Sequence, residues 1–291
     1  MIIVTGATGQ LGRAIVHKLV ERIPAHQVGA SVRDPAKAGD LAALGVRVRQ
    51  GDFGKPESLG HAFEGVTQLV LVSSNAAAYG GDPIAQHRAA ITAAQSAGAT
   101  RIVYTSHMGA SGSSAFPPML DHDRTEEMLR QSGLAWTALR NGFYASSGIA
   151  LLGDALETGV AEAPADGKVA WTAHDDLAEA AAIILANEGR FDGPTPPLTG
   201  PEALDLADIV GIASDMSGRA VRRQVISDDE LRSRMAARGA PGRAADMVLG
   251  LHAASRNGEF ATVDPTLERL LGRRPMSVRD VMAAKARADL A

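Results

Sequence analysis

The chain has 291 residues, of which 45% are hydrophobic and 21% charged, and its formal net charge is −4 at pH 7. This is the composition of an ordinary globular protein, and the mildly acidic balance argues against a nucleic-acid partner or an anionic membrane surface. The sequence contains no cysteine, which excludes disulfides, thiolate metal sites and cysteine nucleophiles.

Short apolar runs alternate with longer amphipathic stretches through the first half of the chain. The expected strands lie at residues 2–5, 27–32, 46–50, 68–72, 101–105 and 135–139. The expected helices lie at residues 10–22, 36–44, 55–63, 83–97 and 121–131. Short buried strands that alternate with helices connect through right-handed crossovers, which produce a parallel sheet with helices on both faces. The predicted fold class is therefore α/β, a doubly wound parallel sheet of the Rossmann type.

The pattern becomes less regular after residue 140. Residues 142–167 are rich in alanine and glycine, and residues 193–201 contain four prolines and are expected to form a loop. Further helices are expected at residues 175–187, 206–216, 228–238, 243–254 and 278–287. We therefore expect a Rossmann domain over residues 1–141 and a smaller, mostly helical part over residues 142–291 that covers the carboxyl edge of the sheet. We also expect the helix at residues 175–187 to return to the first domain.

A glycine-rich segment lies directly between the first expected strand and the first expected helix. Its spacing is G-x-x-G-x-x-G, and its residues are Gly6, Ala7, Thr8, Gly9, Gln10, Leu11 and Gly12. Gly6 permits a tight turn, Gly9 leaves room for backbone beside a pyrophosphate, and Gly12 lets the helix pack closely on the sheet. The first N–H groups of the helix then face the phosphates. The segment predicts a dinucleotide site, although a purely structural strand-to-helix turn is the alternative.

The end of the second strand distinguishes the two nicotinamide dinucleotides. An acidic residue there binds the ribose 2′-hydroxyl of NAD, whereas an arginine accommodates the 2′-phosphate of NADP. The chain has Arg33 at this position, followed by Asp34 and Pro35, and Lys37 lies one turn further on. Two cations can share one phosphate group. We therefore predict NADPH as the cofactor, and the alternative is that Arg33 is an ordinary surface arginine.

Polar and small residues follow the next strands, at the edge where open α/β sheets bind ligands. Asp52 and Phe53 are placed to contact the adenine ring, although a turn or a helix cap explains Asp52 almost as well. The fourth and fifth strands end in further candidates for cofactor contacts, which are Ser73, Ser74, Asn75, Thr105 and Ser106. For each of these the alternative is an ordinary turn at the end of a strand.

These motifs and several later segments resemble one family of nucleotide-binding enzymes. The matching segments are residues 4–12, 32–38, 48–53, 86–88, 104–106, 122–126, 136–144 and 271–275. They are similar to the NmrA-like group of atypical short-chain dehydrogenase/reductases, and within it to the NADPH:quinone oxidoreductases of type 2 and the triphenylmethane reductases. The resemblance covers nearly the whole chain and implies hydride transfer from NADPH to a quinone or a similar conjugated acceptor.

The resemblance also assigns a role to the segment after the sixth strand, Arg140-Asn141-Gly142-Phe143-Tyr144. In the family this segment borders the nicotinamide and the substrate, so Asn141, Gly142 and Phe143 are candidate contacts to the nicotinamide and to an acceptor ring. The residues themselves agree in part, because an Asn-Gly turn with neighbouring aromatic residues follows a strand at the carboxyl edge. A turn followed by two core aromatic residues is the alternative.

The proton relay of typical short-chain dehydrogenases, a Tyr-x-x-x-Lys pair, is missing from the sequence. No tyrosine lies between Tyr104 and Tyr144, and the fourth residue after these two is methionine and glycine respectively. An alkoxide product needs a positioned acid, whereas a reduced quinone carries a far less basic, phenol-like oxygen. Quinone reduction is therefore compatible with this sequence, and His122 is a candidate to assist it. The alternative for His122 is a structural place at the start of the helix at residues 121–131.

The sequence thus favours an NADPH-dependent oxidoreductase with a small, quinone-like acceptor. The alternative is a non-catalytic NADP(H) sensor that binds a partner protein, and a sugar-nucleotide epimerase ranks behind both because it needs the missing tyrosine. The histidines do not show metal-ligand spacing, so no metal is predicted. Because the sequence has neither a targeting segment nor an apolar run of roughly 20 residues, we expect a cytoplasmic protein without a membrane partner. A homodimer is one candidate oligomeric state.

Overall fold

The computed structural model describes residues 1–288, and contacts within the chain divide it into two compact units. Unit 1 consists of Met1–Ala110, Asp121–Asn141 and His174–Pro196. Unit 2 consists of Ser111–Leu120, Gly142–Ala173 and the chain from Pro197 onward. The predicted division into residues 1–141 and 142–291 stays a prediction, since a grouping by contacts does not show which part folds independently.

Unit 1 is built around a seven-stranded sheet in the order β10-β6-β5-β4-β1-β2-β3, in which every neighbouring pair is parallel. The strands are β1 (Ile2–Thr5), β2 (Val28–Val32), β3 (Arg47–Gln50), β4 (Gln68–Leu71), β5 (Arg101–His107), β6 (Ala135–Asn141) and β10 (Gly193–Pro194). The predicted doubly wound parallel sheet is therefore confirmed. The strand order reverses between β1 and β4, which is where open sheets of this class bind their ligands.

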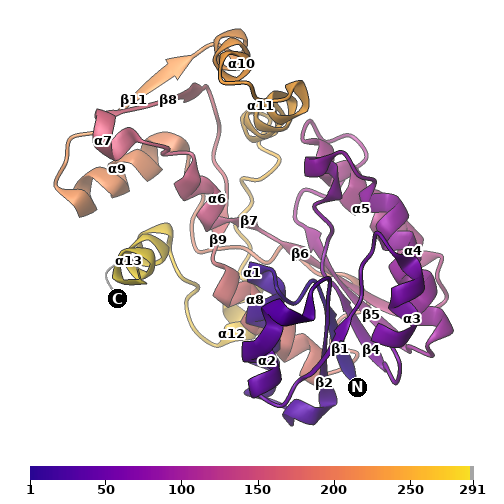
Figure 1. The fold of residues 1–291 in the computed structure, drawn as a ribbon. Coiled ribbons are helices and arrows are strands. Elements are labelled where there is room, and N and C mark those ends of the chain that lie inside the picture. Colours follow the sequence, from indigo (N-terminus) through magenta and orange to yellow (C-terminus); the bar gives the residue numbers. More distant parts are fainter. Residues whose placement is uncertain (289–291) are drawn as a thin grey trace. The chain divides into compact units, whose positions relative to one another are not determined.

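Helices cover both faces of this sheet (Figure 1). One layer contains α1 (Gln10–Val20), α2 (Gly39–Ala43) and α8 (His174–Ala186), and the other contains α3 (Leu59–Ala62), α4 (Pro83–Ser96) and α5 (Pro117–Arg130). Short 3-10 turns lie at Ala25–Gln27, Pro35–Ala38, Pro56–Ser58 and Ala76–Tyr79. Although α8 comes late in the chain, it packs along α1, where Arg22 pairs with Glu179 at 3.0 Å.

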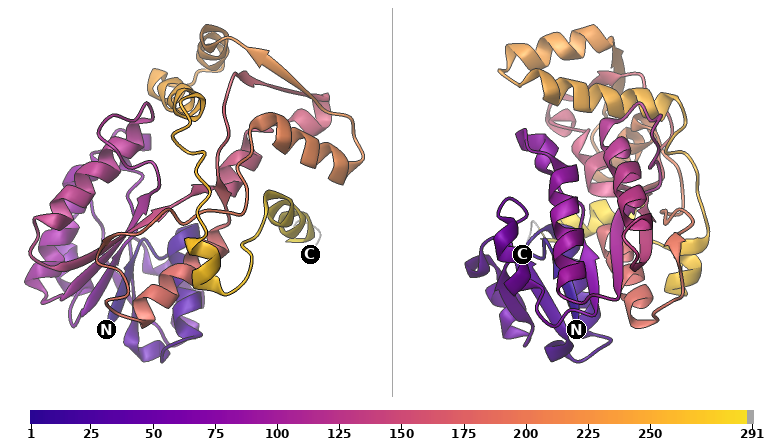
Figure 2. Two further views of the ribbon diagram at one scale, coloured as in Figure 1. Left: turned by 180° about the vertical axis from the view of Figure 1, so that it is seen from behind. Right: turned by 90° about the vertical axis from the view of Figure 1, so that its right-hand side faces the viewer.

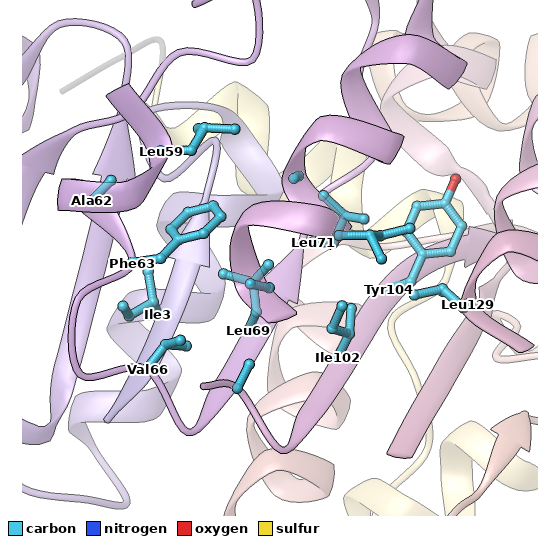
Figure 3. Close-up of a cluster of buried hydrophobic side chains, with 14 of the residues drawn as sticks. Ile3, Leu59, Ala62, Phe63, Val66, Leu69, Leu71, Ile102, Tyr104 and Leu129 are labelled. Carbon is cyan, nitrogen blue, oxygen red and sulfur yellow. The ribbon is translucent and has the colours of Figure 1, made fainter. Parts of the chain in front are cut away.

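Apolar side chains from several elements form a buried core on the face of the sheet that α3, α4 and α5 cover (Figure 3). Ile3 and Leu69 come from neighbouring strands, and Phe63 and Leu129 come from the helical layer. Burial of each such side chain contributes about 1.5–3 kcal/mol. Tyr104 of β5 lies at one end of this cluster, and its hydroxyl oxygen is at the end of the ring that points away from Leu129 (Figure 3).

Unit 2 contains short strands and several helices. Two parallel pairs occur in it, β8 (Val160–Pro164) with β11 (Arg222–Ile226) and β7 (Phe143–Tyr144) with β9 (Trp171–Thr172). The helices are α6 (Ala145–Ala150), α7 (Ala155–Thr158), α9 (Leu206–Ser217), α10 (Asp228–Ala237), α11 (Gly242–Arg256), α12 (Thr266–Leu271) and α13 (Val278–Ala288). The helices α10 and α11 lie side by side (Figure 1 and Figure 2).

One expectation for the later part of the chain is wrong, and several short elements were not predicted, among them α6, α7, α12 and the pairs β7–β9 and β8–β11. Residues 193–201 are not entirely loop, because Gly193 and Pro194 pair with Thr137 and Ala138 at the edge of the large sheet. Proline is tolerated there since one side of an edge strand makes no ladder hydrogen bonds. The pairing of β8 with β11 was not predicted, because neither strand has a regular alternation of apolar and polar residues. Within residues 1–288, no helix is both long and apolar enough to cross a membrane.

Candidate functional site

The turn from β1 to α1 is held by backbone hydrogen bonds. Gly6 has a φ of +58°, in the left-handed region that favours glycine. The N–H group of Gly9 donates to the Gly6 carbonyl at 2.9 Å, and the N–H group of Arg13 donates to the Gly9 carbonyl at 2.9 Å. The Thr5 hydroxyl donates to the Val70 carbonyl at 3.1 Å, which ties the strand before the turn to β4. The turn is thus fixed on both sides.

Gly12 allows α1 to lie directly against this turn. A Cβ atom at Gly12 would be 2.5 Å from the Gly6 carbonyl oxygen and 3.1 Å from the Cα atom of Ala7. Both neighbours belong to the backbone of the turn, so neither can rotate away as a flexible side chain would. Only glycine fits this position without a shift of the helix.

The N-terminus of α1 is open to an anion. Within residues 1–288 no side chain caps this helix, and its first turn contains no acidic residue. Gly9 and Gln10 are exposed and Thr8 is half-buried, whereas Leu11 points into the core. Free N–H groups and the helix dipole favour a phosphate group at such a terminus. The residues predicted from the glycine motif therefore fit a pyrophosphate.

Arg33 and Lys37, which the sequence assigns to the 2′-phosphate, are both exposed in the loop after β2. Among the residues that the structure describes, neither side chain has an ion-pair partner, so both cations are available to a ligand. The loop itself is ordered by Asp34, whose carboxylate accepts a hydrogen bond from the N–H group of Ala36 at 3.1 Å. Asp34 thus serves the loop backbone.

Arg13 connects this loop to the phosphate turn. Its guanidinium group donates to the Lys37 carbonyl at 2.9 Å and forms an ion pair with Asp40. The ion pair holds the pKa of Asp40 below its usual value, chiefly through the hydrogen bond from Arg13. Arg13 lies in the first turns of α1, so it ties the start of this helix to the loop that carries the two exposed cations.

The residues after β3 have clear structural contacts. The Asp52 carboxylate accepts a hydrogen bond from the N–H group of Gly54 at 2.9 Å, and the Asp52 N–H group donates to the Ser58 hydroxyl at 2.9 Å. Phe53 is half-buried against the core cluster. The turn role that the sequence left open for Asp52 is therefore present, and the contact of both residues with an adenine ring stays a prediction.

Side chains from neighbouring elements hold the backbone after β4. The N–H group of Ser73 donates to the Thr105 hydroxyl at 2.8 Å, and that of Ser74 donates to Nε2 of His87 at 2.8 Å. The Ser74 hydroxyl donates to the Gln86 side-chain oxygen at 2.5 Å. Asn75 is exposed at the end of this segment. The position of the segment thus depends on α4 and β5.

His87 is part of a buried chain of hydrogen bonds. Because its Nε2 accepts from Ser74, its Nδ1 carries the proton and donates to the Thr125 hydroxyl at 2.8 Å. The Thr125 hydroxyl donates in turn to the Asp121 carbonyl at 2.7 Å. Burial lowers the pKa of His87 to about 4, so the ring is neutral near pH 7.

Ser106, a predicted cofactor contact, directs its side chain toward the protein. Its hydroxyl donates to the Glu126 carboxylate at 2.6 Å, and Glu126 pairs with Arg140 at 2.8 Å. Glu126 is buried, and the hydrogen bond that Arg140 donates to this carboxylate raises the pKa of Arg140 above its usual value. This network joins α5 to the ends of β5 and β6. A cofactor contact of Ser106 or Thr105 stays a prediction.

Asn141 ends β6 and is 2% exposed. Its backbone carbonyl accepts a hydrogen bond from the N–H group of Met108 at 2.9 Å, and it pairs in register with His107 of β5. Its side-chain oxygen Oδ1 is buried and has no hydrogen-bond partner in the described chain. A buried amide oxygen without a partner is costly, which suits a residue that meets a ligand.

His122 lies in α5 beside the same two strands. Its Nδ1 atom is 2.7 Å from the hydroxyl oxygen of Tyr104, and its ring centroid is 6.0 Å from that of His107. Burial lowers the pKa of His107 to about 3. Burial, with added effects of His107 and His87, lowers the pKa of His122 well below its usual value. Several neutral imidazole rings therefore gather near the carboxyl ends of β5 and β6.

Phe143 belongs to unit 2 and lies in an aromatic cluster. Its ring centroid is 5.7 Å from that of Phe116 and 5.4 Å from those of Trp171 and Phe260. The other three rings are buried, whereas Phe143 is half-buried. The preceding Gly142 is tightly enclosed, because a Cβ atom there would be 2.2 Å from the Thr172 hydroxyl oxygen. Unit 2 therefore contains an aromatic cluster with one partly exposed ring.

Within residues 1–288, no group of three or more histidine or carboxylate residues is arranged to hold a metal ion.

A comparison with known protein families decides the class of this site. The sequence profile of a family described as NAD(P)H-binding matches residues 6–188. The chain belongs to this family. The match begins at Gly6, so it includes the whole phosphate turn, the loop with Arg33 and Lys37, and the elements α4, β5 and α5 that carry His87, His107 and His122. The predicted nicotinamide dinucleotide cofactor is thereby confirmed.

Individual relatives place the chain more closely within the family. Quinone oxidoreductase 2 of Escherichia coli is 38% identical over 273 residues, which cover 94% of this chain and 94% of that protein. An NmrA-like family domain-containing oxidoreductase of Aspergillus flavus is 30% identical over 286 residues, which cover 96% of this chain and 93% of that protein. The predicted NmrA-like membership is confirmed, and the chain is an NAD(P)H-dependent oxidoreductase.

Solved structures agree with these relatives. The structure of an NADPH-dependent quinone oxidoreductase from E. coli, complexed with NADPH, has a TM-score of 0.90 at 36% identity and covers 98% of this chain and 99% of that chain. The structure of the Citrobacter sp. triphenylmethane reductase complexed with NADP(H) has a TM-score of 0.88 at 31% identity, with the same coverage of 98% and 99%. The Rossmann-type fold is therefore shared along nearly the whole length.

Sequence reasoning missed three side chains that organise this site. Arg13 has no motif of its own, because its partner lies 27 residues away in the chain. Tyr104 belongs to the family-like segment at residues 104–106, but its contact with His122 joins residues 18 positions apart. His87 had a usable signal, since residues 86–88 form one of the family-like segments. In this protein, His87 of that segment accepts a hydrogen bond from the Ser74 N–H group and so holds the backbone after β4.

Proposed function

We propose that this protein transfers hydride from NADPH to a quinone or a similar conjugated acceptor, without the Tyr/Lys relay of typical short-chain dehydrogenases. The observation that carries the proposal is the open phosphate turn at residues 6–12 together with the exposed, unpaired cations Arg33 and Lys37. Two relatives support the acceptor class, since they are described as a quinone oxidoreductase and a triphenylmethane reductase. Quinones and triphenylmethane dyes are both conjugated systems that accept a hydride.

The residues of unit 1 fit NADPH better than NADH. The N-terminus of α1 would hold the pyrophosphate, and Arg33 and Lys37 would share the 2′-phosphate. An NAD-specific site needs a carboxylate at the end of β2 to bind the ribose hydroxyls, but Asp34 already binds the loop backbone. The other predicted contacts are Asp52, Phe53, Ser73, Ser74, Asn75, Thr105 and Ser106.

When bound, the reduced nicotinamide supplies a hydride ion. The contribution of the chain is to hold the two reactants in place and to exclude competing orientations. Asn141 would offer its unpartnered Oδ1 atom to the nicotinamide amide, and Gly142 follows it in the chain. Phe143 is the partly exposed aromatic ring that fits a planar acceptor.

The tyrosines near the ends of β5 and β6 do not suit a classical acid. Tyr104 is completely buried and its hydroxyl contacts His122. Burial raises the pKa of Tyr144 to about 12, which makes it a weaker acid than a free phenol. A ketone would therefore lack a proton donor at the developing alkoxide, whereas a hydroquinone anion is stable enough to take its proton from water.

The decisive measurement is the loss of NADPH absorbance with a benzoquinone, a triphenylmethane dye and a simple ketone. We expect turnover of the first two acceptors and none of the ketone, with NADPH preferred over NADH by about 10- to 100-fold. Comparable rates with the ketone would contradict the missing relay. Tight NADPH binding without turnover of any acceptor would overturn the proposal and support the NADP(H) sensor instead.

A further inference from the structure

We propose that His122, fixed by Tyr104 in its neutral Nε2–H tautomer, donates a hydrogen bond to the oxygen that becomes negative on a quinone-type acceptor. This inference rests on the proposed function, because it concerns the acceptor in that reaction. It makes His122 a catalytic residue and Tyr104 the residue that positions it. It also predicts that two kinds of acceptor, which the same site could reduce, depend on His122 to different extents.

The first support is the geometry of the pair. The hydroxyl oxygen of Tyr104 lies 2.7 Å from Nδ1 of His122, a normal distance for a strong hydrogen bond. The ring of Tyr104 has no solvent exposure and is packed in the core cluster, so its hydroxyl group has a fixed position (Figure 3). His122 is half-buried in α5. A rigid phenol thus orients a partly accessible imidazole.

The second support is the direction of this hydrogen bond. A phenol O–H group is more acidic than the N–H group of a neutral imidazole, and an imidazole nitrogen is the better acceptor. Tyr104 therefore donates to Nδ1 of His122. The one proton of the neutral ring must then reside on Nε2, at the opposite side of the ring, where it can be donated to a ligand.

The neutral state of His122 follows from its surroundings. The rings of His107 from β5 and His87 from α4 lie nearby, and burial disfavours a positive charge on any of the three. A neutral imidazole N–H group can stabilise developing negative charge on oxygen when its tautomer is fixed by a neighbour. The imidazole stabilises this charge by a hydrogen bond and keeps its proton, so it does not have to be reprotonated after each turnover.

The third support is the location of His122. Its ring is 6.0 Å from that of His107, which pairs in register with Asn141 at the ends of β5 and β6. Asn141 carries the buried, unpartnered Oδ1 atom. Ligands of open α/β sheets lie outside the carboxyl ends of the strands. His122 is therefore beside the edge at which the nicotinamide and the acceptor would meet.

The role of His122 depends on the acceptor, because hydride transfer gives products of different charge in the two acceptor classes. A quinone gains a hydride and becomes a hydroquinone anion, whose negative oxygen then takes one proton from water. A triphenylmethyl cation gains a hydride on its central carbon and becomes a neutral product, with no negative oxygen and no proton required. A hydrogen-bond donor at His122 accelerates only the first reaction.

The tautomer can be tested in the protein without cofactor. With ¹⁵N-labelled histidine at pH 7.5, we expect the His122 signals of an unprotonated Nδ1 and a protonated Nε2. Tyr104→Phe removes the hydroxyl group and should shift the Nδ1 signal of His122 while leaving the other assigned histidines in place. A protonated Nδ1 on His122 in the unmodified protein would overturn the inference.

The kinetic test compares both acceptors in each variant. His122→Leu should lower kcat for a benzoquinone about 10- to 100-fold and that for a triphenylmethyl cation less than about threefold. His122→Gln retains an N–H donor and should recover part of the quinone rate. Thr125→Val is the matched control, since it removes a buried hydrogen bond from the same helix and should change both rates by the same factor.

The outcomes separate the two proposals. Equal losses for quinone and cation in His122→Leu would show a structural role and overturn the inference, while the proposed function would stand. If the unmodified protein reduces neither acceptor, the proposed function fails, and the catalytic role of His122 fails with it. A selective loss of quinone reduction in His122→Leu, with partial recovery in His122→Gln, is the result we expect.

Discussion

The two ends of the sheet edge in unit 1 are built in different ways. At the β1–α1 turn and the loop after β2, the proposed phosphate contacts come from exposed backbone and from two free cations, Arg33 and Lys37. At the ends of β4, β5 and β6, buried side chains determine the geometry, among them His87 and Asn141. The first end depends on glycines that are close in sequence, and the second depends on contacts between distant elements.

This difference predicts how each end responds to substitution. At the phosphate end, a change should alter cofactor affinity more than stability, because the side chains involved are exposed and lie outside the core. At the buried end, a change should alter stability and its pH dependence, because neutral histidines are enclosed there. The following predictions test that contrast, beginning with the largest expected effect.

Gly12→Ala should have the largest effect at the phosphate end. The added Cβ atom would lie 2.5 Å from the Gly6 carbonyl oxygen, so α1 must shift away from the turn. We expect NADPH affinity to fall by about 1000-fold, since several hydrogen bonds to a charged phosphate are lost at about 1.5–3 kcal/mol each. Isothermal titration calorimetry measures this affinity directly.

Gly60→Ala is the matched control for that variant. No atom lies within 4 Å of the position of its added Cβ atom, and Gly60 is in α3. NADPH affinity should stay unchanged, and stability should rise by about 0.5–1 kcal/mol because alanine favours a helix. Normal NADPH binding by Gly12→Ala would show that the turn does not contact the cofactor.

Arg33→Asp should affect only the cofactor that has a 2′-phosphate. It replaces a cation by an anion at an exposed position, so we expect NADPH affinity to fall about 100-fold and NADH affinity to change less than about threefold. Fluorescence titration with both cofactors measures the two affinities. Arg190→Asp, at another exposed arginine of unit 1, should change neither. Equal losses for NADH and NADPH would contradict the assignment of Arg33.

His87 should make the stability of the protein sensitive to acid. Its pKa is about 4 in the folded protein, against an ordinary value of 6.5, so the unfolded chain binds more protons between these values. The free energy of unfolding is therefore complete above pH 6.5 and decreases as the pH falls toward 4. The contribution of His87 between pH 7 and pH 5 is roughly 2 kcal/mol.

Urea unfolding at pH 7 and pH 5 measures this contribution. His87→Gln cannot titrate, so it should reduce the difference in unfolding free energy between the two pH values by roughly 2 kcal/mol. His26→Gln is the control, because His26 is exposed and should leave that difference unchanged. The same pH dependence in His87→Gln as in the unmodified protein would place the acid sensitivity at other groups.

The contrast between the two ends also explains what the sequence could predict. The strand–turn–helix pattern at residues 2–22 and the cation at Arg33 are local, so they gave the fold and the cofactor class. The aromatic pair at Phe143 and Tyr144 was visible, but its contacts with Phe116 and Phe260 were not, because they join segments of the chain that are far apart. The spacing of apolar residues along the sequence does not show which distant segments come into contact.

The same limit applies to His122. A helix start expected at residue 121 favoured a structural role for His122, whereas the observed helix α5 begins at Pro117. The structure adds the Tyr104 hydroxyl and the neighbouring His107 ring, which fix its orientation and its charge. The short strand β10 was missed for a related reason, since two residues with a proline can pair only when an edge such as β6 is available.

The late position of α8 and β10 has a consequence for the synthesis of the protein. Unit 1 includes His174–Pro196, and α8 packs along α1 and accepts a hydrogen bond from Gln68 at the Leu185 carbonyl. When the ribosome has released only residues 1–141, the glycine turn is already made, but the side of α1 that packs on α8 still faces water. The cofactor-binding unit is completed only when residue 196 of 291 has emerged. Until then, unit 1 lacks a helix that packs on α1 and an edge strand of its sheet.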